Sequence, residues 1–208
     1  MNTVLLVENF PADTAFQFCI DASFQQKKID CLFFYNEGVC NLTQPRWAPL
    51  NIPLFACTNS LEARKINVNE TYLAGLATFV AHALQAGHVV QFNHLGERTT
   101  QPQGDKKNFL ILIESQENLQ AAIDMTLAVS AFEEIMLSVL FKGAGILALV
   151  KQDTITPQQK QIQAWPWYDI HHVYIASPTD KTLILPATPL LEKDIAALLA
   201  QQGCLLQY

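Results

Sequence analysis

Cys57 is the residue in this sequence best placed to act as a nucleophile. It follows residues 52–56, an apolar run that predicts a buried strand, and it precedes Thr58-Asn59-Ser60, residue types that begin helices. A sulfur at a helix start lies near unpaired backbone N–H groups and the positive end of the helix dipole, which favour a thiolate. We therefore expect a reactive thiolate at Cys57, with Asn59, Ser60 and Arg64 as supporting residues. If Arg64 or Lys65 folds back, its positive charge would lie near the sulfur.

The other cysteines are weaker candidates. Cys40 follows a Glu-Gly-Val turn after the second expected strand, but no helix start follows it, so it is the rival of Cys57. Cys19, Cys31 and Cys204 fall on apolar segments and are expected in the core. Five cysteines without a Cys-x-x-Cys pair are expected as free thiols in a reducing compartment. A small buried side chain filling a tight turn remains the alternative interpretation of Cys57.

Other kinds of site have little support in the sequence. His82, His88 and His94 are spaced six apart, and adjacent His171 and His172 would point to opposite sides of a strand, so we expect no metal site. Neither a glycine-rich nucleotide loop nor a Gly-x-Ser-x-Gly elbow is present, and we expect no cofactor. The aromatic cluster from Trp165 to Tyr168 is interpreted as core or interface.

Composition excludes several classes of protein. Apolar residues make up 50% of the 208 residues and charged residues 15%, against a usual charged fraction of about 25%. The net charge of −6 argues against non-specific nucleic-acid binding. No apolar run is long enough to span a membrane, and the N-terminal segment reads as a strand, so we expect a cytoplasmic protein. The low charge also predicts an oligomer, in which apolar surface is covered.

The sequence contains an internal repeat. Residues 3–8 match residues 109–114 at an offset of 106, since both are apolar runs ending in glutamate. Residues 33–42 match residues 140–149 at an offset of 107, and residues 88–92 match residues 204–208 at an offset of 116. Three matches in the same order predict a duplicated domain.

Each half alternates short apolar runs with amphipathic segments, which is typical of strands linked by helices. Residues 71–85 and 189–202 are among the segments predicted to be helices. We therefore predict an α/β fold of two tandem domains, each a mainly parallel sheet with helices on both faces. The first domain covers residues 1–95, a polar linker covers residues 96–107, and the second domain covers residues 108–208. The linker is assigned because it contains Gly96, Pro102 and Gly104 and has no periodic apolar face. Ligands of such sheets gather at the carboxyl ends of the strands, near the point where strand order reverses.

The segments that mark the repeat also carry a family resemblance. The first half resembles the TusD-like branch of the DsrE-like sulfur-relay family through its Phe-Phe-Tyr-Asn-Glu-Gly-Val-Cys segment (residues 33–40) and its terminal strand (residues 88–92). Cys57 falls where that family has its sulfur-accepting cysteine. The second half is similar to the TusC-like branch at residues 168–170, 187–190 and 205–208.

The resemblance implies a function as well as a fold. Proteins of this family carry sulfane sulfur as a cysteine persulfide, toward tRNA 2-thiouridine or a related sulfur-transfer product. It implies sulfur donor and acceptor proteins as partners, a hetero-oligomer with a TusB-like subunit, and a chemically silent second half with Ala176 where a cysteine can occur. Two other functions stay open: a non-catalytic scaffold built on the duplicated fold, and a small-ligand binding protein.

Overall fold

Apolar runs joined by amphipathic segments fold into two α/β units, as predicted. The structure is a computed structural model that describes residues 2–100 and 105–208. Its two units are Met1–Gln101 and Pro102–Tyr208. Each contains a mainly parallel sheet flanked by helices, so the predicted fold class is confirmed. None of the helices in the described ranges combines the length and apolar composition needed to cross a bilayer.

The first unit contains, within residues 2–100, a six-stranded sheet in the order β4-β3-β2-β1-β5-β6. Its strands are β1 (Thr3–Val7), β2 (Ile29–Phe34), β3 (Leu54–Cys57), β4 (Leu73–Ala74), β5 (His88–Asn93) and β6 (Gly96–Thr100). Every neighbouring pair is parallel except β5 and β6, which are antiparallel. Strand order reverses at β1, because β2 lies on one side of it and β5 on the other.

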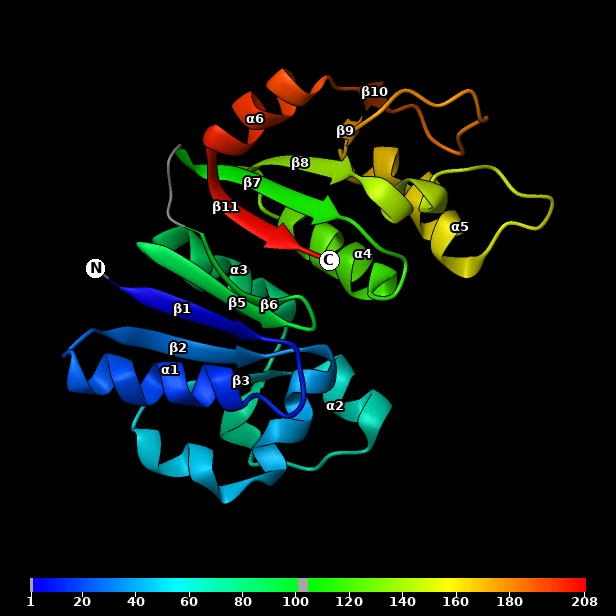
Figure 1. Ribbon diagram of the computed structural model, residues 1–208. Coiled ribbons are helices and arrows are strands. Elements are labelled where there is room, and N and C mark those ends of the chain that lie inside the picture. The colour runs from blue at the N-terminus through cyan, green and yellow to red at the C-terminus, as the bar shows by residue number, and fades with distance from the viewer. Residues whose placement is uncertain (1, 101–104) are drawn as a thin grey trace. The chain divides into compact units, whose positions relative to one another are not determined.

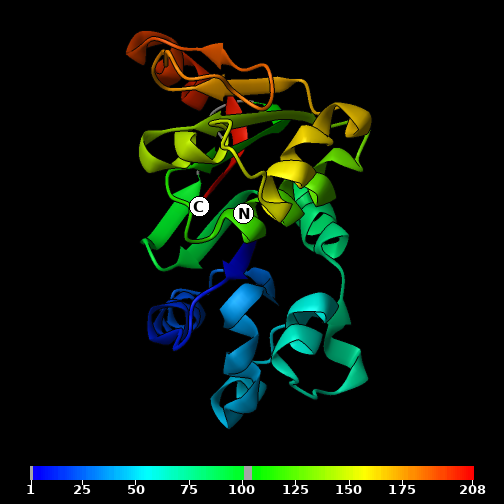
Figure 2. The same cartoon turned by 90° about the vertical axis from the view of Figure 1, so that its right-hand side faces the viewer.

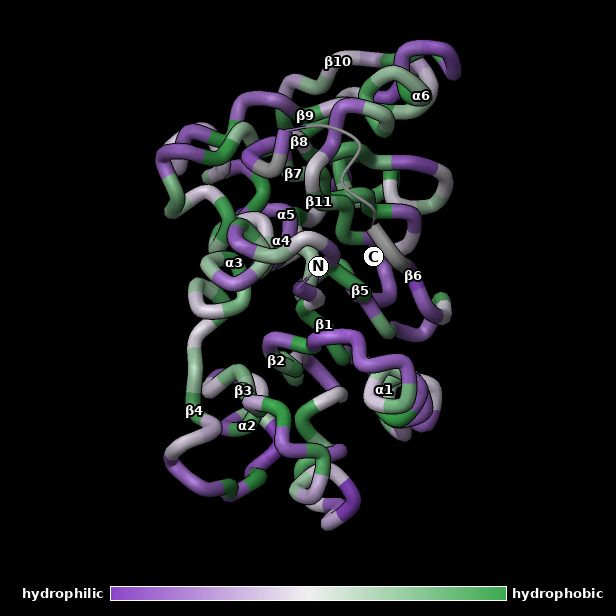
Figure 3. Tube along the Cα trace, turned by 90° about the vertical axis from the view of Figure 1, so that its left-hand side faces the viewer, coloured by the Kyte–Doolittle hydropathy of each residue, from purple (hydrophilic) through white to green (hydrophobic). Residues whose placement is uncertain are grey.

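Helices cover both faces of this sheet. The α-helices are α1 (Asp13–Phe24), α2 (Thr58–Arg64) and α3 (Leu76–Gln85), and the 3₁₀ segments are η1 (Asn36–Thr43), η2 (Pro45–Leu50) and η3 (Glu70–Tyr72). Figures 1 and 2 show α1 and α3 on opposite sides of the sheet. The central strands β1, β2 and β5 are buried except at their first residues, and Figure 3 shows hydrophobic residues on β1 and β5 and hydrophilic residues on β6.

The second unit has the same plan. Within residues 105–208 a five-stranded parallel sheet has the order β10-β9-β8-β7-β11. Its strands are β7 (Asp105–Ile113), β8 (Met136–Phe141), β9 (His172–Ile175), β10 (Thr188–Pro189) and β11 (Gln202–Gln207). Its helical segments are α4 (Leu119–Ser130), η4 (Gly143–Ala148), α5 (Pro157–Gln163), η5 (Trp165–Tyr168) and α6 (Glu192–Ala200). Figures 2 and 3 show α6 on the face opposite α4 and α5.

The repeated sequence segments occupy equivalent places in the two units. The order β4-β3-β2-β1-β5 corresponds to β10-β9-β8-β7-β11, and β6 is an addition to the first sheet. The backbone N–H of Glu8 donates to the Phe92 carbonyl oxygen at 2.8 Å, and that of Glu114 donates to the Tyr208 carbonyl oxygen at 2.6 Å. These four residues are the ones that the sequence offsets align, so the repeat is a repeat of structure.

The predicted linker over residues 96–107 is wrong at both of its ends. Gly96–Thr100 forms β6, and β7 begins at Asp105; residues 101–104 lie outside the described residues. Gly96 adopts a φ of +105°, which allows the chain to reverse after β5 and return along its edge. An edge strand is held by backbone hydrogen bonds and needs no apolar stripe, so its polar sequence resembled a linker.

Two predicted helices begin later than expected, and one helix was not expected. The helix predicted over residues 71–85 begins at Leu76, because Leu73–Ala74 pairs with β3 as β4. The helix predicted over residues 189–202 begins at Glu192, because Thr188–Pro189 pairs with β9. Helix α5 had not been predicted.

Candidate functional site

Cys57 ends β3 and immediately precedes α2, at the carboxyl edge of the first sheet. The register of β3 places it between two strands. Ala56, the residue before Cys57, pairs with Phe34 of β2, and Cys57 itself pairs with Ala74 of β4. The buried side chain of Leu61 anchors α2 in the core and so fixes where the strand turns into the helix. Cys57 is 4% exposed and is therefore buried at this edge.

The hydrogen bonds around Cys57 differ from the expected activation. Within the described residues, Cys57 makes no side-chain capping hydrogen bond to the N–H groups of α2. The guanidinium of Arg64 does fold back over α2, but it donates to two neutral oxygens: Asn36 Oδ1 at 2.6 Å and the Ser60 carbonyl at 3.4 Å. The strand-to-helix position is therefore as predicted, whereas a hydrogen-bonded thiolate is absent from it.

Asn36 joins two of the three predicted supporting residues. Its backbone N–H donates to Ser60 Oγ at 3.1 Å, while its side chain accepts the Arg64 hydrogen bond. Ser60 is buried, and Asn36 adopts a left-handed φ of 49°, which asparagine tolerates better than most residues. Asn59 is exposed, and its side chain makes no hydrogen bond within the described chain, so it stands apart from this cluster. Sequence reasoning had not identified Asn36, because its contacts are made across the fold.

Burial separates the five cysteines into two groups. Burial raises the pKa of Cys19, Cys31 and Cys204 from an ordinary value of 9.0 to about 12, and for Cys31 the negative charge of Asp30 adds to the effect. These three residues stay as thiols at neutral pH, which is the core role expected of them. The other two cysteines stand out by position: Cys40 lies in η1 and is partly exposed, whereas Cys57 is buried at the strand-to-helix turn. Cys40 and Cys57 therefore remain the candidates for chemistry.

Raising the pH from 9 to 10 is expected to lower the free energy of unfolding by about 1 kcal/mol through Cys204 alone. In the folded chain the pKa of its thiol is about 12, whereas the unfolded chain ionises near 9.0. The unfolded state therefore loses a proton that the native state keeps, so this stability is present below pH 9 and is lost as the pH rises toward 12. Urea unfolding at both pH values checks this, since the wild type should lose about 1 kcal/mol more than Cys204→Ala. Equal losses would assign the pH dependence to other groups.

The second unit has alanine where the first has Cys57. The residue before Cys57 pairs with Phe34 in the first sheet. The residue before Ala176 pairs with Phe141, which is the repeat partner of Phe34. Ala176 is thus the structural equivalent of Cys57, and this edge of the second sheet has no nucleophile at that position.

A carboxylate–amide pair recurs at the first strand of both units. Gln91 Nε2 donates to Glu8 Oε2 at 2.5 Å, and Gln207 Nε2 donates to the Oε2 atom of Glu114. Glu114 also forms an ion pair with Lys142 at 3.1 Å. The first pair is buried and lies beside β1, where strand order reverses, whereas Cys57 lies two strands away. The sequence repeat contained this signal, because the same glutamate and glutamine recur in both halves.

Asn41 holds together the loops at the carboxyl end of β1. It is fully buried; its Oδ1 accepts from the Ala12 N–H at 3.0 Å, and its Nδ2 donates to the carbonyl oxygens of Asn9 at 2.9 Å and Gly38 at 2.8 Å. These bonds fasten η1, which begins at Asn36, to the start of α1. The position of Asn36 beside Ser60 therefore depends on Asn41.

Replacing Asn41 with alanine is expected to lower the free energy of unfolding by about 2 kcal/mol, because buried backbone groups lose their partner. Asn59→Ala is the matched control, since Asn59 is exposed, and it should stay within about 0.5 kcal/mol of the wild type. Equilibrium unfolding in urea measures both. If the two variants are equally stable, the three bonds of Asn41 do not hold this edge.

No metal-binding cluster is present in residues 2–100 and 105–208: nowhere do three His, Cys, Asp or Glu side chains gather to hold an ion.

The aromatic cluster of the second unit is divided between core and surface. Trp165 is fully buried, whereas Trp167 is 89% exposed.

Comparison with known proteins adds no assignment: no family model matches the chain, and no curated protein matches it. The sequence motifs, the fold and the geometry around Cys57 are therefore the grounds for a function.

Proposed function

We propose that this chain carries sulfane sulfur as a persulfide on Cys57, as members of the DsrE-like family do. The observation that carries the proposal is the position of Cys57 at the strand-to-helix turn of the carboxyl edge, where ligands of parallel sheets gather. The family resemblance of the surrounding segments supports it. The proposal places the protein in the cytoplasm, in an oligomer with donor and acceptor proteins and a TusB-like subunit, toward tRNA 2-thiouridine or a related product.

The transfer step is a thiol–persulfide exchange. The Cys57 sulfur attacks the outer sulfur of a donor persulfide, a new S–S bond forms on Cys57, and the S–S bond of the donor breaks. The donor leaves as a thiol and takes up the proton that Cys57 gives up, so the sum of the two partners is neither oxidised nor reduced. The reverse sequence delivers the sulfur to the acceptor. No cofactor is consumed.

Access to Cys57 requires local opening in this proposal. The strand beside it, β4, joins β3 through only two residue pairs, Ala56 with Leu73 and Cys57 with Ala74. The side chain of Thr58 adds one hydrogen bond, to the Ala74 carbonyl oxygen at 3.3 Å. Short edge elements with few contacts open at low cost in free energy. We propose that separation of β4 admits the donor.

The scaffold function is the second candidate, and the burial of Cys57 favours it. A cysteine that is 4% exposed and makes no capping hydrogen bond is also what a core residue would show. In that case the two units provide surfaces for assembly and no chemistry.

Alkylation of the folded chain separates the two functions. The Cys40→Ser variant is treated with iodoacetamide; besides Cys57 it keeps Cys19, Cys31 and Cys204, whose pKa burial raises to about 12. A relay protein is expected to be modified at Cys57 in the native state, while Cys19, Cys31 and Cys204 stay unmodified and report that the chain is folded. Modification of Cys57 only after unfolding in urea would favour the scaffold.

A further inference from the structure

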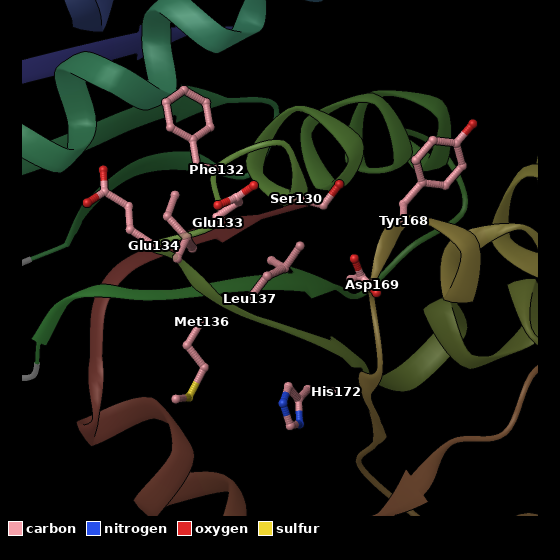
Figure 4. Close-up of a pocket in the computed structure, with 10 residues that line it drawn as sticks. Ser130, Phe132, Glu133, Glu134, Met136, Leu137, Tyr168, Asp169 and His172 are labelled. Carbon is pink, nitrogen blue, oxygen red and sulfur yellow. The ribbon is translucent and has the colours of Figure 1, made fainter.

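The second unit contains a hollow at the end of α4, which we call the α4 pocket. Its volume is about 500 Å³. It is lined by the residues that follow α4, by the start of β8, and by Tyr168, Asp169 and His172. Figure 4 shows the carboxylates of Glu133 and Asp169 on either side of Leu137, with the ring of Tyr168 beyond Asp169.

The charge of the α4 pocket is negative. Glu133, Glu134 and Asp169 all contribute to its lining. Lys107 pairs with Glu134 at 3.3 Å and offsets its charge, so Glu133 and Asp169 carry the negative charge that remains. The exposed carboxylate of Asp169 lies 3.7 Å from His171, which is charged only when protonated.

Helix α4 adds to this negative potential. Its last turn contains no basic residue, although the carboxyl end of a helix carries a partial negative charge that Lys or Arg usually offsets. Instead, Glu133 and Glu134 follow the helix, and Glu133 has no ion pair within the described residues. An occupant with a positive charge would therefore complement the α4 pocket.

Aromatic side chains also line the same hollow. Phe132 and Tyr168 are among its lining residues, and Tyr168 is 54% exposed. Met136 and Leu137 line it from the start of β8, where Met136 is exposed and Leu137 is buried. A guanidinium stacks on aromatic rings and binds carboxylates in its plane, which an ammonium does less well. The lining therefore suits arginine better than lysine.

We propose that the α4 pocket receives an arginine side chain presented by a partner protein. The open lining argues for a protein over a small cation, because Met136 and Tyr168 are more than half exposed and would leave a small molecule largely uncovered. Trp167, which is 89% exposed and adjacent to Tyr168 in the chain, is of a residue type that often carries much of the energy of protein interfaces. This proposal goes beyond sulfur transfer and does not depend on it.

The test uses the full chain labelled with 5-fluorotryptophan and observed by fluorine NMR. Its three resonances belong to Trp47, Trp165 and Trp167, and the last is assigned by its loss in Trp167→Phe. Acetyl-Gly-Arg-Gly-amide is expected to shift the Trp167 resonance saturably and to leave Trp47 unchanged. The same peptide with neutral citrulline in place of arginine should give no saturable shift. An equal response to both peptides would overturn the proposal.

Two double variants then locate the binding site. Glu133→Gln with Asp169→Asn should weaken peptide binding about fivefold or more, since it removes two carboxylates that would pair with the guanidinium. Glu192→Gln with Asp194→Asn removes the same charge from α6, on the other face of the sheet, and should change binding less than twofold. Asparagine tolerates the left-handed backbone of Asp169, and an unchanged Trp165 resonance confirms that each variant is folded. Equal weakening by both double variants would reduce the effect to overall charge and overturn the proposal.

A small cation distinguishes the kind of occupant. Agmatine carries the guanidinium without peptide flanks and is expected to bind more weakly than the arginine peptide, because it leaves the exposed side chains of the lining uncovered. Agmatine binding as tightly as the peptide would overturn the docking surface in favour of a small-molecule site.

Discussion

Gly38→Ala is expected to lower the free energy of unfolding of the first unit by about 4 kcal/mol or more. A Cβ atom at Gly38 would lie 1.9 Å from the carbonyl oxygen of Val7 and 2.6 Å from its carbon. Val7 belongs to β1, which is held by parallel ladders to β2 and β5, so this backbone cannot retreat without breaking hydrogen bonds. Movement of η1 instead would separate Gly38 from Glu8, whose carbonyl accepts its N–H at 3.1 Å.

The repeat predicts the same result in the second unit. A Cβ atom at Gly145 would lie 2.1 Å from the carbonyl oxygen of Ile113, so Gly145→Ala should destabilise that unit by a similar amount. Gly75→Ala is the matched control, because nothing lies within 4 Å of its Cβ position and its φ of −91° suits any residue. Urea unfolding, followed by the fluorescence of buried Trp47 for the first unit and Trp165 for the second, measures the three variants. Tolerance of Gly38→Ala equal to that of Gly75→Ala would contradict the close approach.

Cys57→Ser is expected to abolish sulfur uptake completely. A cysteine desulfurase supplied with cysteine should add about 32 mass units to the intact wild-type chain, which is one sulfur atom. The hydroxyl of serine cannot form a persulfide, although its size is close to that of the thiol, so the variant should gain no mass while keeping its fold.

Cys40→Ser is the control for this loss. Cys40 lies in the neighbouring η1 segment and is more exposed than Cys57, so unspecific sulfur transfer would favour it. The relay proposal requires the Cys40→Ser chain to take up sulfur as the wild type does. Uptake lost in Cys40→Ser and retained in Cys57→Ser would move the function to Cys40. Uptake unaffected by either substitution would remove it from both.

Local sequence predicted most of the strands and helices, but it failed where pairing with a strand distant in sequence decides the secondary structure. Alternating apolar runs and amphipathic segments located most strands and helices, and the repeat predicted two equivalent sheets. The apolar spacing of Leu73 and Leu76 suggested one helix through both, yet Leu73 pairs with Ala56 in the sheet. The unpredicted helix α5, by contrast, does have a local signal in the sequence, because Thr156 and Gln159 form a capping box with Pro157 between them.

The candidate site likewise combines features that local sequence predicts with features that depend on tertiary contacts. The turn at Cys57 is encoded by adjacent residues, an apolar strand followed by Thr58, and was predicted from them. The orientation of Arg64 depends on Asn36, which is distant in sequence and held in place through Asn41. Burial of Cys57 depends on the packing of the whole edge. Neither effect has a local signal, so the expected contact of positive charge with the sulfur was not found.

Mapping the persulfide to a peptide tests the central claim most directly. After loading with a desulfurase and cysteine, the chain is alkylated and cleaved with trypsin. Residues 47–64 form a peptide whose one cysteine is Cys57, whereas Cys31 and Cys40 share the peptide of residues 29–46. The relay proposal predicts that the alkylated peptide 47–64 gains about 32 mass units and that peptide 29–46 does not. Added sulfur on residues 29–46 alone, or on neither peptide, would contradict it.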